Sequence, residues 1–178
     1  MRGKGGMSIG ARATVKIDKM SDDGASAAPN ALHPRLEPLL AYWFVKCDGR
    51  RMPRRRDLPA QDWEPWHRNL ALFEVMQYGS LRIFECRLSG ADLMGRFGRE
   101  ASGLAIDDLA VPVRTELRAS LERACTTAAP VIACGHGAAD GAAYSELILP
   151  LCDRGSAVTA LLLGSYRLDD AKSGPDRD

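Results

Sequence analysis

Apolar residues along the chain follow two different spacings, in segments separated by glycine- and proline-containing turns. Recurrence at every third or fourth position predicts helices over His33–Val45, Ala91–Phe97 and Val111–Ala128, of which the last is the longest. A shorter helix is predicted over Pro59–His67, where two tryptophans lie three residues apart. Pro130 sets the limit of the long helix, because proline cannot continue a helix.

Strands are predicted in two groups on either side of the middle helices. The predicted strands are Ala71–Gln77, Leu81–Ser89, Val131–His136, Tyr144–Leu151 and Ala157–Tyr166. Short turns that contain glycine join the first two strands to each other and the last three in series, so both groups are antiparallel. The last strand is apolar on both faces, which is typical of a strand covered on both sides.

This order of elements predicts an α+β fold with one five-stranded antiparallel sheet. The middle helices cover one face of the sheet, and the N-terminal helix can cover the other. A length of 178 residues with 46% hydrophobic residues fits one domain with tails. The tails predicted to be disordered are residues 1–30 and 168–178, which are rich in small and charged residues.

Charge gives no general case for binding nucleic acid or a membrane surface. The chain has 24 Lys and Arg against 23 Asp and Glu, a formal net charge of +1. One local exception is the run 46–56, with six cations and one acid, which could bind nucleic acid, phospholipid or an acidic partner. The alternative, which we favour, is that its arginines cap helix ends or bridge to the domain. No apolar run could span a bilayer or serve as a secretory signal, so we expect a cytoplasmic protein.

The chemistry-bearing residues do not form a familiar catalytic or metal-binding pattern. The five cysteines are odd in number and contain no C-x-x-C pair, which argues against a disulfide framework or a zinc site. None of the common catalytic motifs is present. His136 could bind haem iron, but we expect an ordinary histidine at a strand end. We therefore predict a protein that is not an enzyme and holds no metal or cofactor.

Six short segments, taken in order, carry a resemblance to a known family. They are Tyr42-Trp43, Arg51–Leu58, Leu70–Val75, Phe84–Ala91, Phe97–Gly103 and Glu146–Leu151. In this series the chain resembles bacterial single-PAS-domain proteins of the alphaproteobacterial type, over roughly Leu32 to Leu163. It departs from them at Ser89–Asp92, where a threonine is common after the glycine, and in an alanine-rich stretch before the fourth strand.

The resemblance implies a PAS-like sheet with helices on one face and an N-terminal helical extension. Residues 31–68 would form the extension and residues 69–167 the PAS-like domain, with tails at 1–30 and 168–178. It further implies a stand-alone sensory or regulatory protein of bacterial signal transduction. Such a protein would bind a small ligand, a signalling protein partner, or both, and its family pattern contains no catalytic residues.

A ligand pocket is expected between the inner face of the sheet and the middle helices. Its candidate lining consists of Phe84, Cys86, Arg87, Leu88, Met94, Phe97, Leu117, Leu121 and His136. Arg87 and His136 would be its polar groups, as a mostly apolar pocket needs a few of them. Two alternatives stay open: the apolar residues form a filled core, and Arg87 forms a salt bridge to Glu85, Glu100 or an acid on a neighbouring strand.

A second hypothesis makes the chain a ligand-free interaction module that forms a homodimer. Its dimer or partner surface would be the apolar side of the first helix, with Leu36, Leu40, Trp43 and Phe44. Leu40, Trp43 and Phe44 would pack either on the outer face of the sheet or on a second copy. A third hypothesis, a regulator associated with nucleic acid, depends only on the basic run 46–56. Nucleic acid is the less expected partner, because no nucleic-acid-binding motif accompanies that run.

Overall fold

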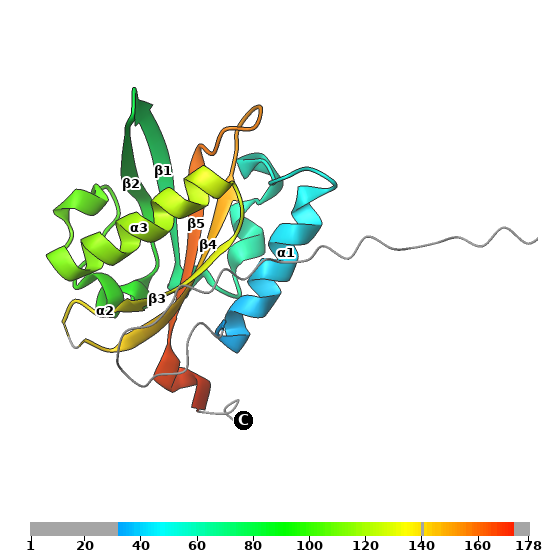
Figure 1. The fold of residues 1–178 in the computed structure, drawn as a ribbon. Helices are drawn as coiled ribbons and strands as arrows, with labels where there is room; N and C mark the ends of the chain where they lie inside the picture. The colour runs from blue at the N-terminus through cyan, green and yellow to red at the C-terminus, as the bar shows by residue number, and fades with distance from the viewer. Residues whose placement is uncertain (1–31, 140, 173–178) are drawn as a thin grey trace, which may run out of the picture.

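A computed structural model describes residues 32–139 and 141–172 of the chain (Figure 1). Its helices and strands are α1 (Glu37–Cys47), β1 (Leu70–Tyr78), β2 (Leu81–Ser89), α2 (Met94–Phe97), α3 (Val111–Thr127), β3 (Val131–His136), β4 (Ala143–Leu151) and β5 (Ala160–Arg167). The tail predicted for residues 1–30 lies outside the described residues. Where the second tail was predicted, residues Leu168–Lys172 form a short 3-10 helix. No described helix is long and apolar enough to cross a membrane.

The five strands form one antiparallel sheet in the order β2-β1-β5-β4-β3. The first and last strands in the chain therefore lie side by side at the centre, with the two hairpin groups on either side. This arrangement confirms the α+β fold with a five-stranded PAS-like sheet. Two predicted strands, Leu81–Ser89 and Val131–His136, have the predicted bounds, and the others differ by a few residues.

The central strands send apolar side chains to both faces of the sheet, and each face has its own core. On the outer face, Leu72, Leu149 and Leu162 belong to one buried cluster. On the inner face, the neighbouring residues Phe73 and Leu161 belong to a second cluster, which α3 and the short middle helices cover. The alternation follows from the pleat of a strand, whose successive side chains point to opposite faces.

Helix α1 covers the outer face, as Figure 1 shows. Leu36, Leu39 and Trp43 are buried there, and the indole Nε1 of Trp43 donates a hydrogen bond to the carbonyl oxygen of Pro150 at 2.9 Å. Gly164 of β5 allows the close approach, because a Cβ there would lie 2.6 Å from a methyl group of Leu36. The N-terminal extension is therefore part of the packed domain.

This packing corrects the partner surface predicted for the first helix. Leu36 and Trp43 cannot contact another molecule, because both are buried against the sheet of their own chain. Leu40 is only partly buried, and Phe44 is exposed. The apolar side of α1 is thus wider than the area that contacts the sheet. Only the edge of this apolar side, which includes Phe44, is exposed.

Two local predictions were wrong for identifiable reasons. Instead of a helix over Pro59–His67, the chain forms short 3-10 turns at Ala60–Trp63 and His67–Asn69. Pro65 lies between them and has no N–H for a helical hydrogen bond. The last strand begins at Ala160 rather than Ala157, because the turn after β4 extends further.

A β-bulge at Arg87 also changes which way the end of β2 faces. Phe73 lies opposite Cys86 and Leu72 opposite Leu88, so Arg87 is an extra residue without a partner on β1. Leu88 therefore shares the outer face with Leu72, although the alternation along the sequence places it on the inner face with Cys86.

We expect Trp43→Ala to lower the free energy of unfolding by about 3–5 kcal/mol, because it leaves a cavity and an unpaired carbonyl oxygen under α1. Phe44→Ala is the matched control: its side chain is 42% exposed against 1% for Trp43, so its loss should be much smaller. Urea titration followed by tryptophan fluorescence or circular dichroism measures both. Equal losses would contradict the packing of α1 described above.

Candidate functional site

The inner core holds one fully buried arginine, Arg96, which comes from α2. Its Nε donates to Oε1 of Glu146 at 2.6 Å, and Glu146 on β4 is almost as deeply buried. Its Nη1 donates to the backbone carbonyl of His136 at 2.6 Å, and its Nη2 donates to Oε2 of Glu116 at 3.2 Å. We call Arg96 with Glu146 and Glu116 the buried centre. Through the one guanidinium group, it joins α2, α3, β3 and β4.

A glycine makes room for this guanidinium group. At Gly135 on β3, a Cβ would lie 2.3 Å from Nη2 of Arg96 and 2.6 Å from its Cζ. The guanidinium thus lies against the bare backbone of β3. Gly98 ends α2 in the left-handed conformation, with φ 77°, which suits glycine.

The buried centre leaves acceptor groups without a partner. Oε2 of Glu146 and Oγ of Ser165 are buried and have no hydrogen-bond partner among the described residues. Glu146 and Ser165 lie directly opposite each other on β4 and β5. Buried polar atoms usually have a partner, so this position can accept a water molecule or a small polar group.

Five of the residues predicted to line the pocket come together in the inner core. Phe84, Cys86, Phe97, Leu117 and Leu121 are all buried and belong to the same cluster. Their side chains pack against one another and against neighbours from the sheet. The five residues are part of one buried hydrophobic cluster, and the choice between a filled core and a ligand pocket stays a prediction.

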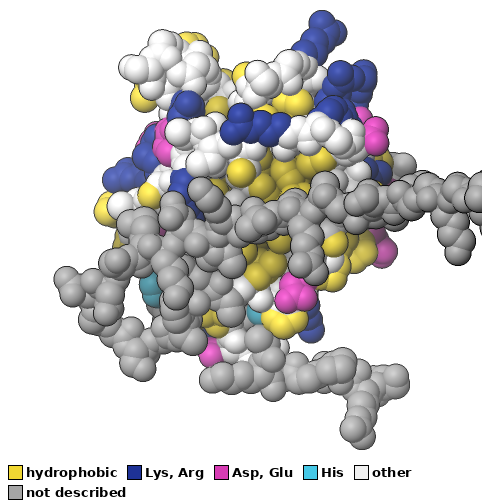
Figure 2. Space-filling model, turned by 45° about the vertical axis from the view of Figure 1, so that its right-hand side comes forward, with side chains coloured by type: hydrophobic (Ala, Val, Ile, Leu, Met, Phe, Trp, Pro, Cys, Tyr) yellow, Lys and Arg dark blue, Asp and Glu magenta, His cyan; other side chains and the backbone are white. Residues whose placement is uncertain are grey.

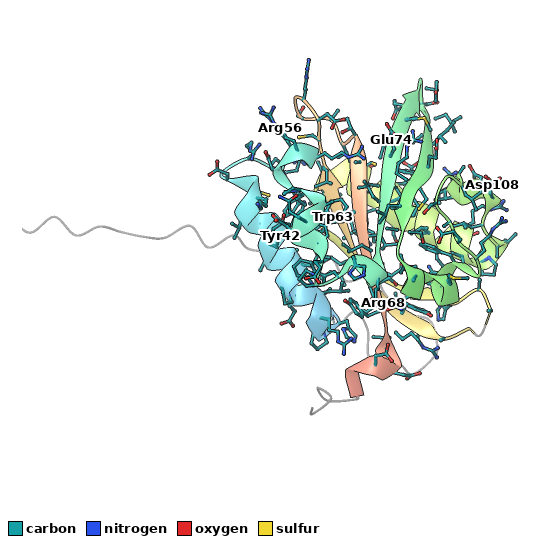
Figure 3. The ribbon with its side chains drawn as sticks, turned by 180° about the vertical axis from the view of Figure 1, so that it is seen from behind. Tyr42, Arg56, Trp63, Arg68, Glu74 and Asp108 are labelled. Carbon is teal, nitrogen blue, oxygen red and sulfur yellow. The ribbon has the colours of Figure 1, made fainter. Side chains whose placement is uncertain are left out.

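The other four predicted residues lie elsewhere, so the predicted lining needs correction. Leu88 and Met94 are exposed, the former because of the bulge. Arg87 forms ion pairs with Glu74 and Glu85 on the outer side of the sheet, which is the salt-bridge alternative (Figure 3 labels Glu74).

His136 is also exposed, at the end of β3. Its Nδ1 lies 2.8 Å from Oε1 of Glu116, and its backbone N–H donates to Oε2 of the same carboxylate. His136 therefore contacts Arg96 directly through its backbone carbonyl oxygen and indirectly through Glu116. Its ring is exposed.

The cysteines differ in their exposure. Burial raises the pKa of the Cys86 thiol to about 12 and that of the Cys125 thiol to about 11, so both are protonated at neutral pH. Cys134 on β3 is exposed. In the part of the chain that the structure describes, no three His, Cys, Asp or Glu side chains come together as a metal site.

A surface groove of about 590 Å³ lies where the N-terminal extension meets the sheet domain. Its lining residues come from four parts of the chain: Arg35 and Pro38, the segment Glu64–Asn69, Asp92, and Tyr166. The ring of His33 stacks on Tyr166 with 5.0 Å between centroids, and Arg68 pairs with Asp92 at 2.7 Å (Figure 3 labels Arg68). No pattern in the sequence predicts this groove, because only the fold brings these four segments together.

We expect Arg96→Met to lower the free energy of unfolding by about 3–5 kcal/mol, since the change leaves the Glu146 carboxylate buried without its cation. The double variant Arg96→Met/Glu146→Leu should lose at least about 1 kcal/mol less than the single variant, because it removes that charge as well. Arg68→Met, at an exposed ion pair, should lose less than about 1 kcal/mol. Similar losses for Arg96→Met and Arg68→Met in chemical denaturation would argue against this account of the centre.

Comparison with known proteins adds one finding to this geometry. No curated protein matches the sequence. A family model described as a PAS domain matches residues 31–166, which cover the N-terminal extension, all five strands except the end of β5, and the middle helices. Since the match extends over most of the chain, this protein belongs to the PAS domain family.

Proposed function

We propose that this chain is a stand-alone sensory and regulatory module of bacterial signal transduction, which acts in the cytoplasm by binding rather than by catalysis. Membership of the PAS domain family supports a role of this general kind. The input would be a small molecule that occupies the groove, and the output would be a changed position of α1 on the sheet.

The observation that carries the proposal is that the groove spans two parts of the fold. Arg35 and Pro38 belong to the N-terminal extension, whereas Asp92 and Tyr166 belong to the sheet domain. Its volume of about 590 Å³ lies in the range of small-molecule sites, roughly 300–1,000 Å³. An occupant that contacts both parts favours one position of α1, which is how a bound molecule shifts a conformational equilibrium.

A path from the groove to the buried centre supports the same proposal. Arg68, on the groove, donates three hydrogen bonds to Asp92, at 2.7 and 3.1 Å to Oδ1 and 3.2 Å to Oδ2. Asp92 lies in the 3-10 turn that leads into α2, four residues before Arg96. A displacement of Arg68 at the groove would therefore move α2. Its Arg96 is bonded to α3, β3 and β4.

The proposal is tested on protein purified from its native host. Mass spectrometry of the compounds released by denaturation should find one species near stoichiometry in the wild type and in Arg114→Ala, a variant on α3 away from the groove. Arg68→Ala should retain less of it, because one wall of the groove loses its ion pair. Hydrogen exchange in Glu37–Cys47 should slow when the compound is restored. Release of nothing from the wild type, or equal amounts from Arg68→Ala, would contradict the proposal.

A second candidate function is homodimerisation through the exposed margin of α1. Phe44 is 42% exposed and Val45 is 75% exposed. Apolar side chains at such a margin favour contact with a partner molecule.

For this candidate we expect light scattering to give twice the chain mass at micromolar concentration, and Phe44→Glu to return the protein to a monomer. Leu81→Glu, at the exposed tip of the β1–β2 hairpin, is the control and should leave the mass unchanged. A monomeric wild type, or an unchanged dimer in Phe44→Glu, would exclude α1 as a dimer interface.

A further inference from the structure

Four arginines from two loops that are far apart in the sequence meet at one end of the sheet. Arg54, Arg55 and Arg56 belong to the loop after α1, and Arg154 belongs to the turn between β4 and β5. We call this group the arginine rim. Figure 2 shows Lys and Arg side chains gathering at this end of the molecule, and Figure 3 labels Arg56 beside the β4–β5 turn.

Backbone hydrogen bonds hold the two loops of the arginine rim together. The N–H of Arg55 donates to the carbonyl oxygen of Cys152 at 2.8 Å, and the N–H of Cys152 donates to that of Pro53 at 3.1 Å. Met52 and Leu58, on either side of the arginines, are buried in the outer core. Hydrogen bonds and buried flanking residues thus hold the backbone of both rim loops in place. Arg54 and Arg55 are half-buried, and Arg56 and Arg154 are exposed.

The two arginines just before the rim have structural roles. Arg50 donates to the carbonyl oxygens of Lys46 and Cys47 at the end of α1, and it forms an ion pair with Asp57 at 2.8 Å. Arg51 donates to the carbonyl oxygen of Thr127 at the end of α3. The helix-capping role favoured for the basic run therefore holds for these two residues.

Several other arginines in the described part of the chain have carboxylate partners, unlike the four of the arginine rim. Those with carboxylate partners are Arg50, Arg68, Arg82, Arg87, Arg96 and Arg118. None of the four rim residues has a described carboxylate oxygen within 4.0 Å. Asp57, the acid nearest to them in sequence, is already bound by Arg50 and by the N–H of Arg54. Asp153, the exposed sequence neighbour of Arg154, leaves the rim with an excess of positive charge.

We propose that the arginine rim binds a short acidic segment of a protein partner. A guanidinium group matches a carboxylate with two parallel hydrogen bonds, so adjacent arginines suit a run of Asp and Glu side chains. The surroundings favour this partner over nucleic acid. The rim consists of a 3-10 turn and a hairpin turn, without a helix to enter a groove of DNA and without an exposed aromatic ring on either loop to stack on a base.

The charge of the whole chain points the same way. A formal net charge of +1 gives no wide positive field for a long polyanion, while a compact group of four cations can hold a short one. The interaction does not depend on an occupant of the groove, since the rim and the groove share no residue.

The test uses a fluorescein-labelled hexaglutamate peptide and the full chain, with fluorescence polarisation at low salt and at about 0.1 M salt. Changing Arg55, Arg56 and Arg154 together to Gln should weaken binding at least about tenfold and reduce its salt dependence. A control variant that changes Arg99, Arg114 and Arg123 to Gln alters the net charge equally and should bind almost as the wild type does, because these residues belong to neither the rim nor the groove. Thermal melts confirm that all three proteins are folded.

Three results would overturn the proposal. The wild type could fail to bind the peptide at low salt. The two triple variants could lose equal affinity, which would show a response to net charge alone. A labelled DNA duplex could bind more tightly than the peptide and lose binding in the rim variant, which would assign the rim to nucleic acid.

Discussion

The apolar character of both sheet faces is the constraint on which the rest of this structure depends. Leu161, Leu162 and Leu163 alternate between two separate cores, so neither face of β5 can be left to water. The middle helices cover the inner face and α1 covers the outer one. The family match begins at residue 31 and thus includes α1, in agreement with a domain whose N-terminal helix is part of its packing.

Much of the fold could be predicted from local patterns. Alternating apolar positions next to turn residues located β2 and β3 to the residue, and regular helical spacing with Pro130 located α3. The failures occurred where a distant part of the chain decides the conformation. Leu88 lies on the outer face because β2 has a bulge at Arg87 where it pairs with β1. The alternation of apolar residues along one strand does not reveal such a bulge, which depends on the pairing with another strand.

The candidate site was harder to predict, because its polar residues look ordinary in the sequence. Arg96 lies between the apolar positions Leu93 and Phe97, where a short helix usually turns a charged side chain to solvent, and its partner Glu146 lies fifty positions further along the chain. The clue was Gly135, whose missing side chain leaves space for the guanidinium group. A glycine within a strand can indicate that another group packs closely against the backbone, but it does not identify that group.

The long reach of α1 has a consequence for how the chain folds during its synthesis. The N–H of His33 bonds to Ser145 and the indole of Trp43 bonds to Pro150, contacts that span 112 and 107 positions. Helix α1 leaves the ribosome early, yet the strands that cover its apolar side are made last. Until then Leu36, Leu39 and Trp43 are open to water and to other chains, so a nascent molecule of this protein is a natural client for a chaperone that shields apolar segments.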